Sequence, residues 1–273
     1  VISWLPSEDN RQFSPFDVLD AALATEGQTS SLSGITLTIQ SFLVDPQAMA
    51  DIRKKIINKS LETILNRPTP EAVRATQTIG KALQYPWGNG ISQENRAVWN
   101  PEFTDTLRRL EEIVANPDID PYVSVQLRHL LSDSLRFEKS GIGTAVQAVL
   151  DKIPKTLEYE ISRALANGHG WAERFSKDFA KDEAAFEKWR ASLIEKLLDH
   201  YPNDNKGLIA VLEERVATLD SIKLTKGGDP GPFIGAIIER SPNFGKELGE
   251  YILVNPSSSL ANMFGAVITA LAH

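Results

Sequence analysis

The sequence contains no cysteine, only two methionines and only four histidines. Without cysteine the chain has no disulfide, no cysteine-ligated zinc site and no thiol nucleophile. Long apolar runs are also missing. The most apolar window, residues 260–272, contains Asn262 and Thr269 and is shorter than the roughly 20 residues that span a bilayer. We therefore expect a buried helix there and no membrane contact.

Positive charge is in deficit as well. The chain has 29 Lys and Arg against 36 Asp and Glu, a net charge of −7. This balance disfavours a dedicated nucleic-acid binder, which needs a basic face to neutralise phosphates. The rest of the composition is typical of a soluble globular protein with a substantial core. We expect a cytoplasmic protein.

The N-terminus lacks the features of a signal peptide. The sequence begins at Val1, and no charged n-region or apolar h-region precedes a cleavage site. We expect an excised piece of a longer parent chain, with processing as the alternative.

Catalytic and metal-binding motifs are absent at the level of sequence. None of the histidines lies in an H-E-x-x-H or Glu-x-x-His pattern, and His169 with Glu173 would supply only two ligands. The loop that begins at Lys139 lacks the spacing of a phosphate-binding loop, and no G-x-S-x-G elbow occurs. The sequence predicts no catalytic residue, no metal site and no cofactor.

Helical periodicity is the strongest signal that is present, and it is clearest from Phe103 to Phe137. Asn116-Pro117 ends a first helix, because the residue before proline is pushed out of the α region, and Asp120-Pro121 begins a second. Each helix has one apolar stripe. The stripes consist of Phe103, Leu107, Leu110 and Val114, and of Val123, Leu127, Leu130 and Leu131.

Similar helix pairs follow downstream. They are predicted at residues 143–153 with 155–166, within about 182–219, and at 232–254, before a last helix at 257–272. The first helices start about 40 to 50 residues apart, near the spacing of helical-hairpin solenoids. The prediction is an all-α fold, an α-α superhelix built as a solenoid-like stack of antiparallel helical hairpins. It covers residues 101–273, with a less regular helical region at 1–100, in one continuous domain.

The N-terminal region is harder to interpret. Ser14-Pro15 predicts a helix to Thr25, and Ile35–Val44 fits both strand alternation and one helical face. Because helices dominate elsewhere, we expect a helix there. Asp45-Pro46 opens another helix, and Thr69-Pro70 opens its partner. The first of these helices carries the basic run Arg53, Lys54, Lys55 and Lys59, either as a solvated face or as a contact for a polyanion.

Aromatic residues supply the candidate binding positions. Tyr85–Pro101 is predicted to be a long connection with two tryptophans, which either pack back on neighbouring helices, form a binding loop or mark a domain junction. A later aromatic series begins with Trp171, Phe175 and Phe179 and continues to Phe186 and Trp189. These side chains either pack in the core or form an exposed groove for a peptide or helix. The candidate partner-binding residues are Trp87, Trp99, Trp171, Phe175 and Phe179.

The segment Asp120-Pro-Tyr-Val, followed by Leu127 and Leu130-Leu131, resembles the second half of a HEAT-type helical repeat. Pro70-Glu-Ala-Val-Arg is similar to part of the same motif, whereas Ser124 stands where an arginine is usual. The chain as a whole is similar to the C-terminal α-solenoid of a bacterial STAND-type signalling NTPase. The resemblance implies a scaffold that recognises a trigger and carries no catalytic residues, with the NTPase module outside this chain.

The sequence therefore favours a non-catalytic module that recognises another protein or a peptide, as a fragment of a larger regulatory or signalling protein. Two alternatives remain open. One is an all-α enzyme whose acidic and histidine residues meet only in three dimensions. The other is a nucleic-acid-binding helical-repeat domain that uses Arg53, Lys54, Lys55 and Arg74.

Overall fold

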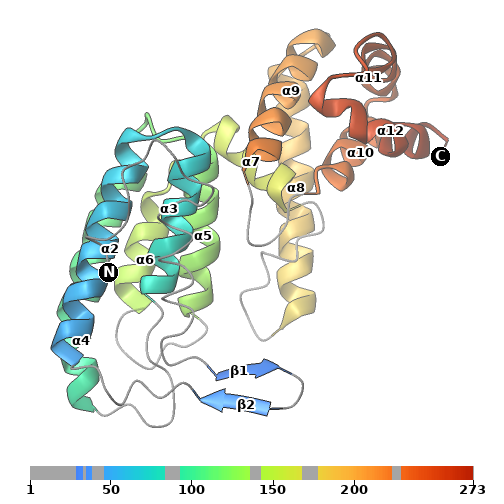
Figure 1. Ribbon diagram of the computed structural model, residues 1–273. Coiled ribbons are helices and arrows are strands. Elements are labelled where there is room, and N and C mark those ends of the chain that lie inside the picture. The colour runs from blue at the N-terminus through green and yellow to red at the C-terminus, as the bar shows by residue number, and fades with distance from the viewer. Residues whose placement is uncertain are drawn as a thin grey trace. The chain divides into compact units, whose positions relative to one another are not determined.

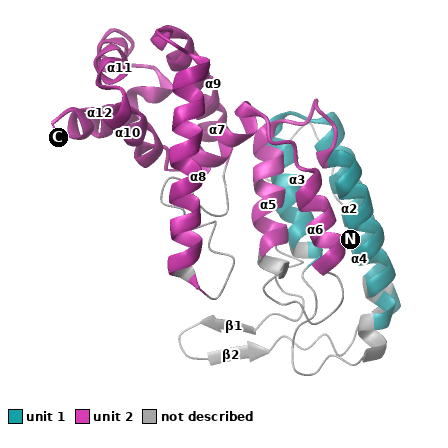
Figure 2. Cartoon of the chain, turned by 180° about the vertical axis from the view of Figure 1, so that it is seen from behind, with its two compact units in different colours: residues 1–113 teal, residues 114–273 magenta. Residues whose placement is uncertain are grey.

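The computed structural model describes residues 29–32, 35–38, 46–83, 93–135, 143–167, 178–222 and 229–272 (Figure 1). The chain divides into two compact units, residues 1–113 and 114–273 (Figure 2). Almost all of the described regular structure is helical, which confirms the predicted helical class. None of the described helices combines the length and the apolar character that crossing a membrane requires.

The first unit contains a short β hairpin. Strand β1 (Thr29–Leu32) pairs antiparallel with β2 (Ile35–Thr38), and Thr29 lies opposite Thr38. The expected helix over Ile35–Val44 is therefore wrong at its first four residues. Both periodicities fit the side chains of this segment, and pairing with β1, from which two residues separate it, gives the backbone of β2 the ladder partner that decides for a strand. The remainder of that prediction, and the helix predicted from Ser14, lie outside the described residues.

Helices α2 (Pro46–Asn66) and α3 (Thr69–Ala82) pack against each other. The predicted starts at Pro46 and Thr69 are confirmed. Their apolar faces form the core of the unit, with Ile57, Val73 and Ile79 fully buried. Buried threonines satisfy their own hydroxyls by donating to backbone carbonyls; Thr76, for example, donates to the carbonyl of Val73 at 2.6 Å.

Helix α4 (Gln93–Val114) begins earlier than the sequence predicts and contains Pro101. The expected connection Tyr85–Pro101 is therefore wrong from Gln93 onward. Proline removes one N–H and leaves the carbonyl four residues earlier without its helical partner. Here that carbonyl belongs to Ala97, and both residues are exposed, so that water reaches it. The predicted stripe is confirmed, since Phe103, Leu107, Leu110 and Val114 are all buried.

The second unit opens with α5 (Pro121–Leu135), α6 (Gly143–Lys152) and α7 (Leu157–Ala166). Asp120 caps α5 by accepting a hydrogen bond from the backbone N–H of Tyr122 at 2.8 Å. This helix start is the one predicted from Asp120-Pro121. Val123, Leu127 and Leu131 are buried as expected, and Leu130 is half-buried.

Helices α8 (Phe179–His200) and α9 (Asn205–Ser221) follow. Between them Asn203 adopts a left-handed φ of 61°, and the Asp204 carboxylate accepts from the backbone N–H of Gly207 at 2.9 Å. These two features end one helix and begin the next. Phe186, Leu193 and Leu197 are buried at the predicted spacing.

The C-terminal elements are α10 (Gly231–Arg240), α11 (Pro242–Val254), the 3₁₀ helix η4 (Ser259–Met263) and α12 (Phe264–Leu271). Helices α10, α11 and α12 pack on one another. The expected single helix over 257–272 is wrong in detail, because its first turn is 3₁₀ and is held by contacts from α9 that are described below. Leu260 and Val267 still supply buried apolar contacts.

Candidate functional site

A groove of about 820 Å³ lies on the second unit between α9 and α11. Its walls are two helices that contact each other only at part of their length, and η4 also contacts both. The lining residues are Lys206, Ile209, Ala210, Glu213, Glu214, Glu247, Glu250, Tyr251, Val254 and Asn255. The set combines an apolar surface with four carboxylates against one ammonium group.

The apolar part of the groove continues onto the protein surface. Ile209 is buried, whereas Val254 is 79% exposed and its neighbour Leu253 is 69% exposed. These are the two most exposed large apolar side chains of the described residues. Adjacent exposed apolar side chains beside a groove, rimmed by polar residues, mark an interaction surface more often than isolated ones do.

Glu213 has a structural task. Its carboxylate accepts hydrogen bonds from the backbone N–H of Ser259 at 2.8 Å and of Leu260 at 3.4 Å, and from the Ser258 hydroxyl. Free N–H groups at a helix start require such acceptors. Glu213 therefore caps η4 from α9 and fixes the end of the groove where α11 leads into η4.

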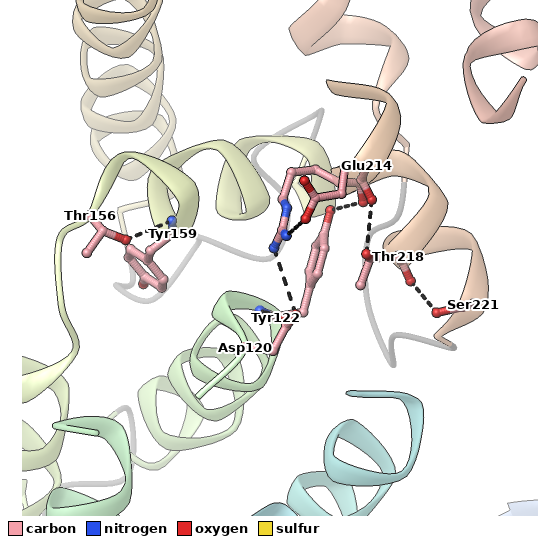
Figure 3. Close-up of polar contacts among 8 residues, drawn as sticks. Asp120, Tyr122, Thr156, Tyr159, Glu214, Thr218 and Ser221 are labelled. Carbon is pink, nitrogen blue, oxygen red and sulfur yellow. Dashed lines mark hydrogen bonds and ion pairs between the residues drawn. The ribbon is translucent and has the colours of Figure 1, made fainter. Parts of the chain in front are cut away.

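Glu214 belongs to a polar junction between α5 and α9 (Figure 3). It pairs with Arg215, whose guanidinium also lies 3.8 Å from the Asp120 carboxylate. The Tyr122 hydroxyl donates to the Arg215 carbonyl at 2.8 Å, and burial raises the pKa of Tyr122 above its ordinary value near 10. This junction anchors α9, while the Glu214 side chain remains 65% exposed.

The two carboxylates from α11 differ from each other. Glu247 accepts a hydrogen bond from the Asn205 side chain at 2.7 Å, which joins α11 to the start of α9. Glu250 is exposed and, within the described part of the chain, has neither a hydrogen bond nor an ion pair. Glu250 is therefore available to a partner.

The carboxyl group of Asp220 on α9 is also perturbed. Partial burial raises the pKa of Asp220, and the nearby Glu213 carboxylate raises it further.

The aromatic residues predicted to bind a partner do not form this groove. Trp87, Trp171 and Phe175 lie outside the described residues. Trp99 falls within α4 and Phe179 is the first residue of α8, and only their backbone positions are described. Their predicted role stays a prediction.

The last aromatic residue of the same series has a defined environment. Trp189 is half-buried, and the Arg163 guanidinium stacks 3.9 Å from its ring centroid. The indole N–H donates to the Glu160 carboxylate at 3.4 Å, and the ring lies 5.3 Å from that of Phe186. Trp189 therefore joins α8 to α7.

The basic run on α2 is partly neutralised within its own unit. Lys54 pairs with Glu102 at 3.1 Å and Lys59 pairs with Glu62 at 3.3 Å, while Lys55 and Arg74 are exposed. Of the histidines, His129 is buried on α5 and His200 is exposed at the end of α8. No three His, Asp or Glu side chains in the described ranges lie close enough together to hold a metal ion.

The chain matches no protein-family model, no curated protein and no solved structure.

The groove was not predicted from the sequence, although one signal for it exists. Tyr251, Ile252, Leu253 and Val254 are four consecutive apolar residues in a helix, and four successive positions point to all sides of a helix. At least one of them has to face away from the core.

Proposed function

We propose that this chain is a non-catalytic protein-recognition module and that it binds a segment of another protein in the groove between α9 and α11. The observation that carries the proposal is the combination of a sizeable groove with the exposed Val254 in its lining, next to which Leu253 is also exposed. Fully burying one Leu or Val side chain contributes about 1.5–3 kcal/mol. A partner that covers both side chains gains that energy without any change in the fold.

A protein segment fits this surface better than a small molecule does. Small-molecule sites enclose most of their ligand, whereas this apolar surface runs out of the groove onto the exposed end of α11. The groove walls are helices, and recognition in a groove between helices is a recurrent mode of peptide binding. The site therefore suits an extended partner that lies along the surface.

The architecture agrees with a scaffold role. From α5 to α9, helices contact neighbours one or two elements along the chain: α5 contacts α6 and α7, and α7 contacts α8 and α9. Two contacts reach further, because α7 also contacts α10 and α9 contacts η4. A predominance of contacts between nearby elements is a property of solenoid-like stacks. We therefore retain the HEAT-like stack, as part of a larger signalling protein in the cytoplasm, as the setting in which this groove acts.

The test is a selection of displayed random peptides on the intact chain, followed by binding to two matched variants. Ala210 and Ala217 are both exposed on α9, but only Ala210 lines the groove. Ala210→Trp fills the groove, and Ala217→Trp adds the same side chain elsewhere on the helix. We expect selected peptides to lose binding to Ala210→Trp and to keep it with Ala217→Trp.

Peptides that bind both variants equally well would place the binding surface elsewhere and contradict the proposal. A selection that yields no binding peptide, from a chain whose circular dichroism confirms folding, would contradict it as well.

A further inference from the structure

We infer that the partner segment is an amphipathic helix with lysine or arginine beside its apolar stripe. The inference rests on the proposed function and specifies the chemistry of the occupant. It follows from the charge around the groove, the lengths of its walls and the positions of its apolar residues.

The charge at the rim selects a basic partner. Four of the ten lining residues are glutamates, and Lys206 is the one cation among them. Glu213 and Glu247 are engaged in contacts that hold the walls together. Glu250 remains to meet a cation of a partner, and the Glu214 carboxylate, although paired with Arg215, is exposed enough to meet another. A partner with carboxylates or phosphates at the same positions would be repelled.

The apolar floor excludes a partner that is merely cationic. Ile209, Ala210 and Tyr251 share the groove lining with the carboxylates, and Val254 adds an exposed apolar side chain at the end of α11. A polycation without apolar side chains would leave this surface uncovered. The occupant therefore needs apolar anchors and positive charges on the same segment.

The walls set the length and the shape of the segment. Helix α11 has 13 residues, which corresponds to about 20 Å. A partner helix of three to four turns would run along this length and present anchors at i, i+3 or i+4, and i+7, as helices in grooves do. The flanking positions of the same helix would carry Lys or Arg toward Glu214 and Glu250.

Three synthetic helical peptides of about 14 residues test this inference by fluorescence anisotropy with the intact chain. The first has a leucine stripe flanked by lysines, the second has the same stripe flanked by glutamates, and the third replaces the leucines by serines and keeps the lysines. We expect only the leucine–lysine peptide to bind, more weakly as NaCl rises from about 0.05 M to about 0.5 M.

Charge variants locate the interaction. Glu250→Lys should weaken the leucine–lysine peptide about threefold to tenfold. Glu239 on α10 is exposed and does not line the groove. Glu239→Lys changes the net charge by the same amount and should leave the affinity unchanged. Ala210→Trp should abolish binding.

Three outcomes would overturn the inference. Equal or tighter binding of the leucine–glutamate peptide in a manner sensitive to Ala210→Trp would mean that the groove takes an acidic segment, and the proposed function would stand. Equal binding of the serine–lysine peptide would mean charge attraction alone. Self-association that Ala210→Trp abolishes, without peptide binding, would identify a second copy of the chain as the occupant.

Discussion

The two faces of α11 differ in almost every respect. The inner face includes Gly245, Leu248, Gly249 and Ile252, which are buried, and α11 packs on α10 and α12. The outer face carries Glu250 and Val254, which are exposed at the groove. One helix of 13 residues thus contributes both to the core and to the candidate binding surface. Because the two roles lie on opposite faces, substitutions should separate stability from binding.

The largest effect is expected on the inner face. Leu248 is fully buried, and Leu248→Ala should lower the free energy of unfolding by about 2–5 kcal/mol, since a cavity adds to the lost transfer energy. Urea unfolding followed by circular dichroism measures it. Leu253 is 69% exposed on the same helix, and Leu253→Ala is the control with little change. Equal effects of the two variants would mean that the faces are wrongly assigned.

Two glycines of the inner face sharpen the comparison. A Cβ at Gly245 would lie 2.5 Å from Ile238 Cγ2, whereas a Cβ at Gly249 would meet Val267 Cγ1 at 3.6 Å. Gly245→Ala should therefore destabilise by about 1–3 kcal/mol through overpacking. Gly249→Ala should stabilise by about 0.5–1 kcal/mol, because alanine favours the helix. The thermal midpoints should move in opposite directions, and a shared direction would contradict the close approach at Gly245.

Glu213 has both a binding role and a stability role, because it lines the groove and also caps η4. Glu213→Ala should cost about 0.5–2 kcal/mol, as the loss of a helix cap does, and should speed amide hydrogen exchange at Ser259 and Leu260. Glu214→Ala removes a neighbouring carboxylate that is 65% exposed and should change stability by less than about 0.5 kcal/mol. Unchanged exchange at Ser259 in Glu213→Ala would contradict the capping role.

The smallest change in stability is expected on the outer face. Val254 is 79% exposed, and Val254→Ser should alter the free energy of unfolding by less than about 0.5 kcal/mol. The same substitution removes an apolar anchor and should weaken the leucine–lysine peptide by about tenfold or less. Peptide titration measures the affinity and urea unfolding measures the stability, both on the same preparation. A loss of stability without a loss of affinity would reverse the roles assigned to the faces.

The helices were largely predictable because their signals are local. Pro46, Thr69 and Pro121 mark helix starts where the structure has them, and the stripe from Phe103 to Val114 is buried as its spacing predicts. These predictions depend on caps and on period, which a single segment carries by itself.

The predictions that are wrong depend on solvent, on strand pairing or on partners distant in the sequence. Pro101 is a helix breaker by local rules, but its exposed side lets the helix continue. Ile35–Thr38 is a strand because β1 pairs with it. The groove brings together residues from α9 and α11 that are separated by about 40 positions, and no spacing rule connects Glu213 with Glu250. Only the apolar run that ends at Val254 hinted at this surface.

The Glu213 cap has a consequence for the order of folding. Its hydrogen bond to the Ser259 backbone joins positions 46 residues apart and closes a chain loop that contains all of α10 and α11. Closing such a loop costs configurational entropy before the contact repays it. We therefore expect α10 and α11 to form their own pair first, and the α9–η4 connection to form late, as the step that completes both the C-terminal cluster and the end wall of the groove.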